Sequence, residues 1–94
     1  MTDSPQASLR TPTTTRAAIA ERIEAYRAGQ LTNAALAAWA FDRFYAEELG
    51  NEAYEAGAED LIATVLDTLM FGDDPGFRLD EEELRALVVR LSTL

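Results

Sequence analysis

The 94-residue chain is 48% hydrophobic and 27% charged, which is the size and composition of one globular domain with a single core. It contains no cysteine, histidine or lysine, which excludes thiol nucleophiles, histidine bases, Cys/His metal sites and Schiff-base chemistry. Its net charge of −9 disfavours nucleic acid and anionic membrane surfaces as partners.

The N-terminal segment, residues 1–15, reads MTDSPQASLRTPTTT and has one large apolar residue, Leu9, after the initiator. Such a segment cannot cover a core, so the sequence predicts a disordered leader over residues 1–15 and a helical domain over residues 16–94. The chain has neither the long apolar run of a signal peptide nor the roughly 18 apolar residues that cross a bilayer. We therefore expect a cytoplasmic protein that does not bind membranes.

The first predicted helix begins after the threonine run at 13–15, which offers three N-cap residues, and ends near Ala28. Gly29 supplies the left-handed conformation that ends many helices. The apolar residues of this helix recur at i, i+4 and i+7 and form one stripe: Ile19, Ile23 and Tyr26.

A second helix is predicted from its N-cap Thr32 to about Leu49. Its large apolar residues are spread over more than one face: Leu36, Trp39, Phe41, Phe44, Tyr45 and Leu49. We therefore expect this helix to be contacted from two sides, with Trp39 and the other aromatic residues in the core.

A third helix is predicted from Glu52 to Phe71, although residues 51–58 fit either a helix or an ordered loop. Its second half has a broad apolar face: Leu61, Ile62, Val65, Leu66, Leu69 and Met70. The sequence then predicts a type II turn at residues 74–77, because Pro75 and Gly76 occupy the two central positions.

The last helix follows Asp80, which forms a capping box with Glu83 three residues later. Its apolar residues recur at i, i+3, i+4 and i+7: Leu84, Leu87, Val88 and Leu91. No segment shows the alternation of a β-strand, so the predicted fold class is all-α, a four-helix antiparallel bundle in a single domain.

The acidic residues are concentrated in the second half of the chain. Residues 1–40 hold four arginines and three carboxylates, whereas residues 41–94 hold four arginines and fourteen carboxylates. Surface carboxylates keep a small protein soluble, but a regional excess also attracts a basic partner. Both interpretations fit the composition.

Three carboxylate clusters are candidates for a site. Asp73 and Asp74, with Asp80, resemble a calcium loop in composition but lack its alternating ligands, so a polar turn is the preferred interpretation. The acids at 81–83 favour the positive end of a helix dipole in any protein. A third set has near-helical spacing without lysine or arginine to offset it, and indicates either a solvated face or a cationic partner: Glu48, Glu52, Glu55 and Glu59.

The order of several short elements resembles the colicin D immunity protein family. These elements are AGQLT at 28–32, FYAEE at 44–48, the apolar helix at 61–71, and an Asp-Pro loop leading to RLDEEELR at 78–85. The likeness covers residues 19–91 and is mainly compositional. It implies a small acidic four-helix bundle that occupies the basic, RNA-binding active site of a tRNA-cleaving toxin.

Carried over to this chain, the resemblance makes surface carboxylates substitutes for RNA phosphates. The candidate partner-binding residues are Glu47, Glu48, Asp73, Asp74, Asp80, Glu81 and Glu82. The chain departs from the family in its alanine content, its lack of lysine and its Thr/Pro leader, and individual toxin-contacting positions cannot be matched.

The sequence thus predicts a non-catalytic, immunity-type inhibitor of a basic nuclease, with no cofactor and no metal. The alternative is a helical interaction module or homodimer that uses apolar surface at Phe41, Tyr45 or Phe77. An enzyme that relies on carboxylates alone is the third, least favoured hypothesis.

Overall fold

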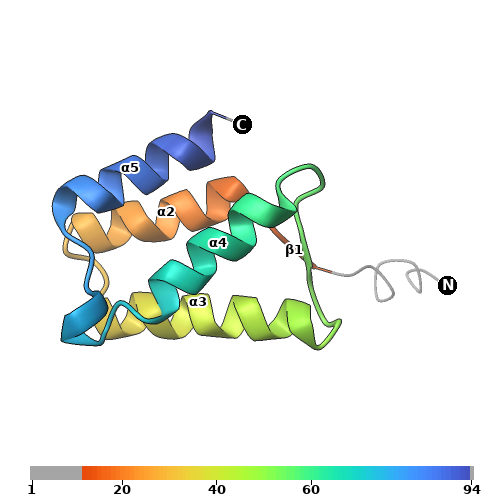
Figure 1. The fold of residues 1–94 in the computed structure, drawn as a ribbon, viewed down its shortest axis with the longest axis horizontal. Coiled ribbons are helices and arrows are strands. Elements are labelled where there is room, and N and C mark those ends of the chain that lie inside the picture. Colours follow the sequence, from red (N-terminus) through yellow and green to blue (C-terminus); the bar gives the residue numbers. More distant parts are fainter. Residues whose placement is uncertain (1–11, 94) are drawn as a thin grey trace, which may run out of the picture.

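The computed structural model describes residues 12–93 and is an all-α fold with one very short parallel strand pair (Figure 1). Over residues 12–93 the elements are β1 (Thr13–Thr14), α2 (Arg16–Arg27), α3 (Asn33–Glu48), β2 (Ala53–Tyr54), α4 (Glu59–Met70), the 3₁₀ helix η1 (Pro75–Phe77) and α5 (Glu81–Ser92). The predicted fold class is confirmed. None of the helices in this range has the length and apolar character needed to span a membrane.

The helices form two antiparallel pairs. In the first pair, α2 lies along α5, because Arg27 near the end of α2 bonds Glu81 at the start of α5, and Arg16 at the other end of α2 bonds the carbonyl oxygen of Leu91. In the second pair, Asn33 at the start of α3 donates to the carbonyl oxygen of Gly72, just after α4. Figure 1 shows α4 running obliquely between α3 and the α2–α5 pair.

The core lies where the four helices meet and is built from the predicted stripes. The buried apolar residues are Ile19 and Ile23 of α2, Leu36, Ala37 and Ala40 of α3, Ile62, Val65, Leu66 and Leu69 of α4, Leu84, Leu87 and Leu91 of α5, and Tyr54 and Ala58 between α3 and α4. Burial of each isoleucine, leucine or valine side chain in this core stabilises the fold by about 1.5–3 kcal/mol.

Helix ends follow the predicted capping residues. Thr15 and Thr32 accept hydrogen bonds from Ala18 and Ala35, and Asp80 forms the capping box with Glu83. Gly29, just after α2, has a φ of 80°, in the left-handed region that a glycine adopts without a steric penalty.

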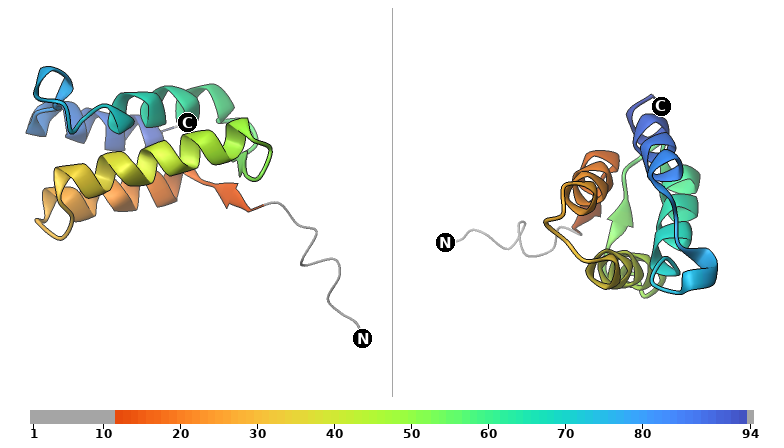
Figure 2. Two further views of the ribbon diagram at one scale, coloured as in Figure 1. Left: turned by 90° about the horizontal axis from the view of Figure 1, so that it is seen from below. Right: turned by 90° about the vertical axis from the view of Figure 1, so that its left-hand side faces the viewer.

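The predicted leader over residues 1–15 extends too far along the chain at its C-terminal end. Residues 1–11 lie outside the described residues, but Thr13 and Thr14 pair in parallel with Ala53 and Tyr54, and Thr14 is 4% exposed. Figure 2 shows the two strands side by side. The ordered domain therefore begins before residue 16, because β2 provides backbone partners for a segment that has no apolar pattern of its own.

In the second half of the chain, the alternative left open at residues 51–58 is decided against the helix, and one local prediction, the type II turn, is wrong. The third helix begins at Glu59 rather than Glu52, since residues 51–58 form β2 and a turn in which Gly57 has a φ of 85°. The type II turn at 74–77 is a 3₁₀ helix, because Asp74 caps Gly76 and Gly76 does not adopt a positive φ.

Candidate protein-binding surface

The acidic segment between α3 and α4 is neutralised within the molecule. Glu55 accepts hydrogen bonds from the Arg16 backbone N–H at 2.9 Å and from its guanidinium at 2.9 and 3.1 Å. These side-chain and backbone bonds lower the pKa of the Glu55 carboxyl, and the Coulomb attraction of Arg16 adds to them. Glu55 therefore holds the start of α2 against the segment after β2.

Glu52 has a similar internal role. One of its oxygens accepts from the Thr14 hydroxyl at 3.0 Å, and the other is bonded by the guanidinium of Arg43 on α3. Glu52 and Glu55 are therefore not part of an uncompensated acidic row. The predicted row lacks a common helix face, because residues 51–58 are not helical, and Arg16 and Arg43 offset two of its four charges.

Three of the predicted partner-binding residues also have internal partners. Asp74 caps η1, and Asp80 caps α5. Glu81 accepts from the Arg27 guanidinium at 2.9 Å, and this hydrogen bond is the main cause that lowers the pKa of its carboxyl. These three residues are exposed, but their hydrogen bonds hold the segment from η1 to the start of α5 in place.

The other four predicted residues have no side-chain hydrogen bond or ion pair within residues 12–93: Glu47, Glu48, Asp73 and Glu82. They do not form one cluster. Glu47 and Glu48 end α3, whereas Asp73 follows Gly72, which is bonded to the start of α3. The sixteen residues of α3 separate these two groups by about 22 Å along the helix axis.

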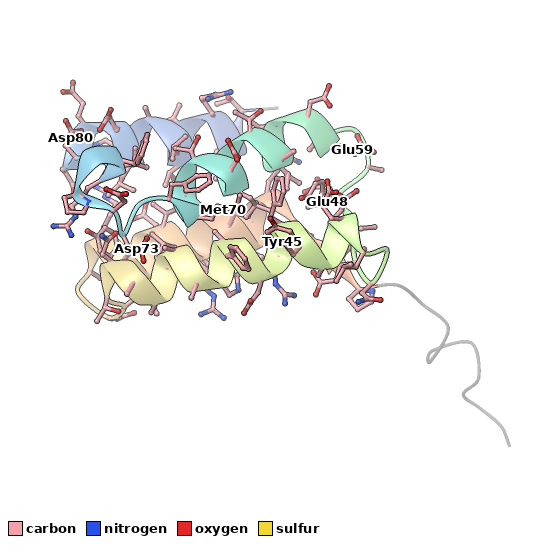
Figure 3. The ribbon with its side chains drawn as sticks, turned by 60° about the horizontal axis from the view of Figure 1, so that its bottom comes forward. Tyr45, Glu48, Glu59, Met70, Asp73 and Asp80 are labelled. Atoms are coloured by element: carbon pink, nitrogen blue, oxygen red, sulfur yellow. The ribbon has the colours of Figure 1, made fainter. Side chains whose placement is uncertain are left out.

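The side of the molecule that carries α3 and α4 is strongly acidic. These two helices together contain six carboxylates and one arginine, Arg43, which is already bonded to Glu52. By contrast, α2 contains three arginines and two glutamates. In Figure 3, Tyr45 and Met70 lie between Glu48 and Glu59 at one end of this side and Asp73 and Asp80 toward the other. We call the surface formed by α3, α4 and Asp73 the α3–α4 side. Its carboxylates are Asp42, Glu47, Glu48, Glu59, Asp60, Asp67 and Asp73.

Negative charge at the end of α3 also acts on a buried group. Burial of Tyr54, together with the charges of Glu47, Glu48 and Glu52, raises the pKa of its phenol to about 12. The negative charges of Glu47 and Glu48 thus disfavour ionisation of the buried Tyr54 phenol.

Two of the four aromatic side chains of α3 are exposed, against the expectation that they lie in the core, whereas Trp39 and Phe44 are partly buried against it. Phe41 is 49% exposed and Tyr45 is 45% exposed, and their ring centroids are 4.5 Å apart. Trp39 packs partly against the core, and the Arg22 guanidinium lies 5.3 Å from its ring centroid. Because Ala37 and Ala40 occupy the buried positions of α3, this face offers small side chains to the core, and Phe41 and Tyr45 lie on its flank.

The spacing of these exposed residues can be read from the sequence. Phe41, Tyr45 and Leu49 follow one another at i, i+4 and i+8, a stripe separate from the one formed by Leu36 and Ala40. Phe71 and Phe77 form a second exposed aromatic pair, 6.2 Å between centroids.

The pocket between the four helices is too small for an organic ligand. A pocket among α2, α3, α4 and α5, lined by Tyr26, Leu36, Leu69 and Leu84 among others, has a volume of about 10 Å³. That is the space of one water molecule at most. Within residues 12–93, no group of three or more carboxylates is arranged to hold a metal ion.

Comparison with known proteins adds no relative to these observations: no protein-family model, curated protein or solved structure matches the chain.

Proposed function

We propose that this protein is an immunity-type inhibitor that binds a basic nuclease domain and covers its substrate-binding surface. The observation that supports the proposal best is the charge of the α3–α4 side, where six carboxylates accompany one arginine that is already paired. A nuclease directs arginine and lysine side chains at phosphates, and carboxylates bind the same groups through charge-assisted hydrogen bonds. Glu47, Glu48 and Asp73 have no internal partner in residues 12–93 with which such a nuclease would compete.

Inhibition of this kind requires neither a catalytic group nor a cofactor. The capping box and the arginine bridges fix the helices before binding, so little backbone conformational entropy is lost when a partner docks. The regional negative charge accelerates encounter with a basic domain, and this acceleration decreases as salt screens the charges. An inhibitor of an RNA-cleaving enzyme would act in the cytoplasm, where the RNA is.

The proposal is tested by affinity capture with the full chain from a lysate of the source organism, followed by an RNA-cleavage assay of the captured protein. We expect a basic nuclease that is retained at low salt and lost at high salt, and whose cleavage of tRNA stops when the wild-type chain is added. Reversal of Glu47, Glu48, Asp73 and Asp74 to lysine should abolish this inhibition.

The matched control is Glu21→Lys, which reverses an exposed carboxylate on α2, away from the α3–α4 side. It should inhibit as the wild type does. Full inhibition by the fourfold variant would refute the proposal.

A homodimer or structural module is the second candidate, and the exposure of Phe41, Tyr45 and Phe77 (49%, 45% and 63%) favours it. Apolar contacts do not weaken with salt, so this candidate predicts a dimer that persists at high salt. A monomer by sedimentation at high micromolar concentration would contradict it.

A further inference from the structure

Phe41 and Tyr45 have no role in a surface that binds by charge alone. We propose that these two rings are the apolar centre of the interface on the α3–α4 side, and that an amphipathic helix with lysine or arginine beside its apolar face covers them. This inference rests on the proposed function, because it assigns the kind of partner segment that the same acidic side binds.

The two rings form one continuous apolar surface. Phe41 and Tyr45 are one helical turn apart, with centroids 4.5 Å from each other, and Tyr45 also contacts Phe44 edge to face at 5.7 Å. Leu49, 72% exposed, follows one turn later and extends the stripe to about 12 Å along α3. An apolar stripe of two to three turns matches the i, i+4, i+8 face of another helix.

The charges around the stripe select a cationic helix. Asp42 lies three residues before Tyr45 and Glu48 lies three residues after it, so both carboxylates neighbour this ring on the helix surface. The arginine of α3, Arg43, is bonded to Glu52 and therefore does not neutralise these carboxylates. Aromatic side chains at the centre with charged groups at the rim is the common anatomy of a protein interface.

The same charges disfavour other occupants. A second copy packed on this stripe about a two-fold axis would place Asp42 and Glu48 near the carboxylates of the other copy, and like charges across an interface oppose binding. An anionic membrane surface is repelled for the same reason. A basic amphipathic helix satisfies both the apolar stripe and its carboxylates.

The test uses a synthetic helical peptide of about 18 leucines and lysines with the leucines on one face, titrated into the full chain and followed by backbone amide NMR shifts. We expect shift changes centred on residues 41–49 and binding that persists in part at about 0.5 M salt. The double variant Phe41→Gln, Tyr45→Gln should weaken binding at least tenfold. Circular dichroism checks that the variant keeps its helices.

Two matched controls separate this surface from general attraction to an acidic protein. Phe77→Gln removes an exposed aromatic residue away from the stripe and should leave the affinity unchanged, and a scrambled peptide of the same composition should bind weakly and only at low salt. Equal binding by the double variant or by the scrambled peptide would overturn the inference. So would concentration-dependent shifts of residues 41–49 without peptide, which would indicate a second copy.

The outcomes also separate this inference from the function on which it rests. If the fourfold charge reversal abolishes inhibition while the double glutamine variant still binds the peptide normally, the inhibitor proposal stands and the aromatic centre does not. If the double variant loses the peptide while the charge reversal leaves inhibition intact, the stripe binds helices but the inhibitor proposal fails.

Discussion

Thr14 provides a direct test of whether β1 belongs to the folded domain. Its hydroxyl donates to the Glu52 carboxylate at 3.0 Å, and its side chain is buried. Thr14→Val keeps the shape and β-branching but leaves one oxygen of Glu52 without that donor. A hydrogen bond to a charged group contributes about 1.5–3 kcal/mol, and we expect the lower end because Glu52 keeps its ion pair with Arg43.

In a domain of this size, each kcal/mol lowers the melting temperature by about 4–8 °C, so a loss of about 1.5 kcal/mol gives a decrease of roughly 6–12 °C. Thermal unfolding followed by circular dichroism measures this decrease. Thr13→Val is the matched control, since Thr13 lies in the same strand but is exposed, and its effect should stay within about 0.5 kcal/mol. Equal melting temperatures for the two variants would refute the ordered strand.

Three further predictions concern caps, pH and the buried phenol. Asp80→Ala removes the capping box and should lower the free energy of unfolding, measured with urea, by about 1 kcal/mol. The control Asp73→Ala changes an exposed residue outside the caps and should leave the free energy of unfolding almost unchanged. Similar losses for the two variants would contradict the capping role. Because the folded pKa of Glu55 lies below its ordinary value of 4.5, its contribution to stability is present above that pH and is lost as the pH falls through the lowered pKa. Glu55→Gln should therefore reduce the stability difference between pH 6 and pH 3, and an unchanged difference would contradict the Arg16 bridge. Spectrophotometric titration of the tyrosines should show one group with a pKa of about 12 that Tyr54→Phe removes. If that group remained in the Tyr54→Phe variant, the assignment of the raised pKa to Tyr54 would be contradicted.

The helices could be predicted because their signals are local. A threonine or aspartate cap and an apolar stripe lie within one turn to three turns of each other, as in α5, where Asp80, Glu83 and Leu84 determine the start of the helix. The same holds for α2 and for the apolar face of α4.

The strand pair and the Arg16–Glu55 bridge could not be predicted, because their partners are far apart in the sequence. Thr14 and Glu52 are 38 residues apart, and Arg16 and Glu55 are 39 residues apart. Residues 51–58 have glutamates at helical spacing, which favoured a helix, but these carboxylates satisfy groups of β1 and α2 instead. The regional acidity was visible in the sequence, whereas the division between paired and unpaired carboxylates required the fold.

The packing of α2 against α5 has a consequence for how the domain forms. These are the first and the last helices of residues 12–93, and Arg27–Glu81 and Arg16–Leu91 join their two ends. During synthesis, Ile19 and Ile23 of α2 have no complete apolar partner until Leu84, Leu87 and Leu91 are made, so the nascent chain stays partly open until its last helix emerges. A shortened product that lacks α5 would expose the apolar face of α2 and would be cleaved by proteases more readily than the whole domain.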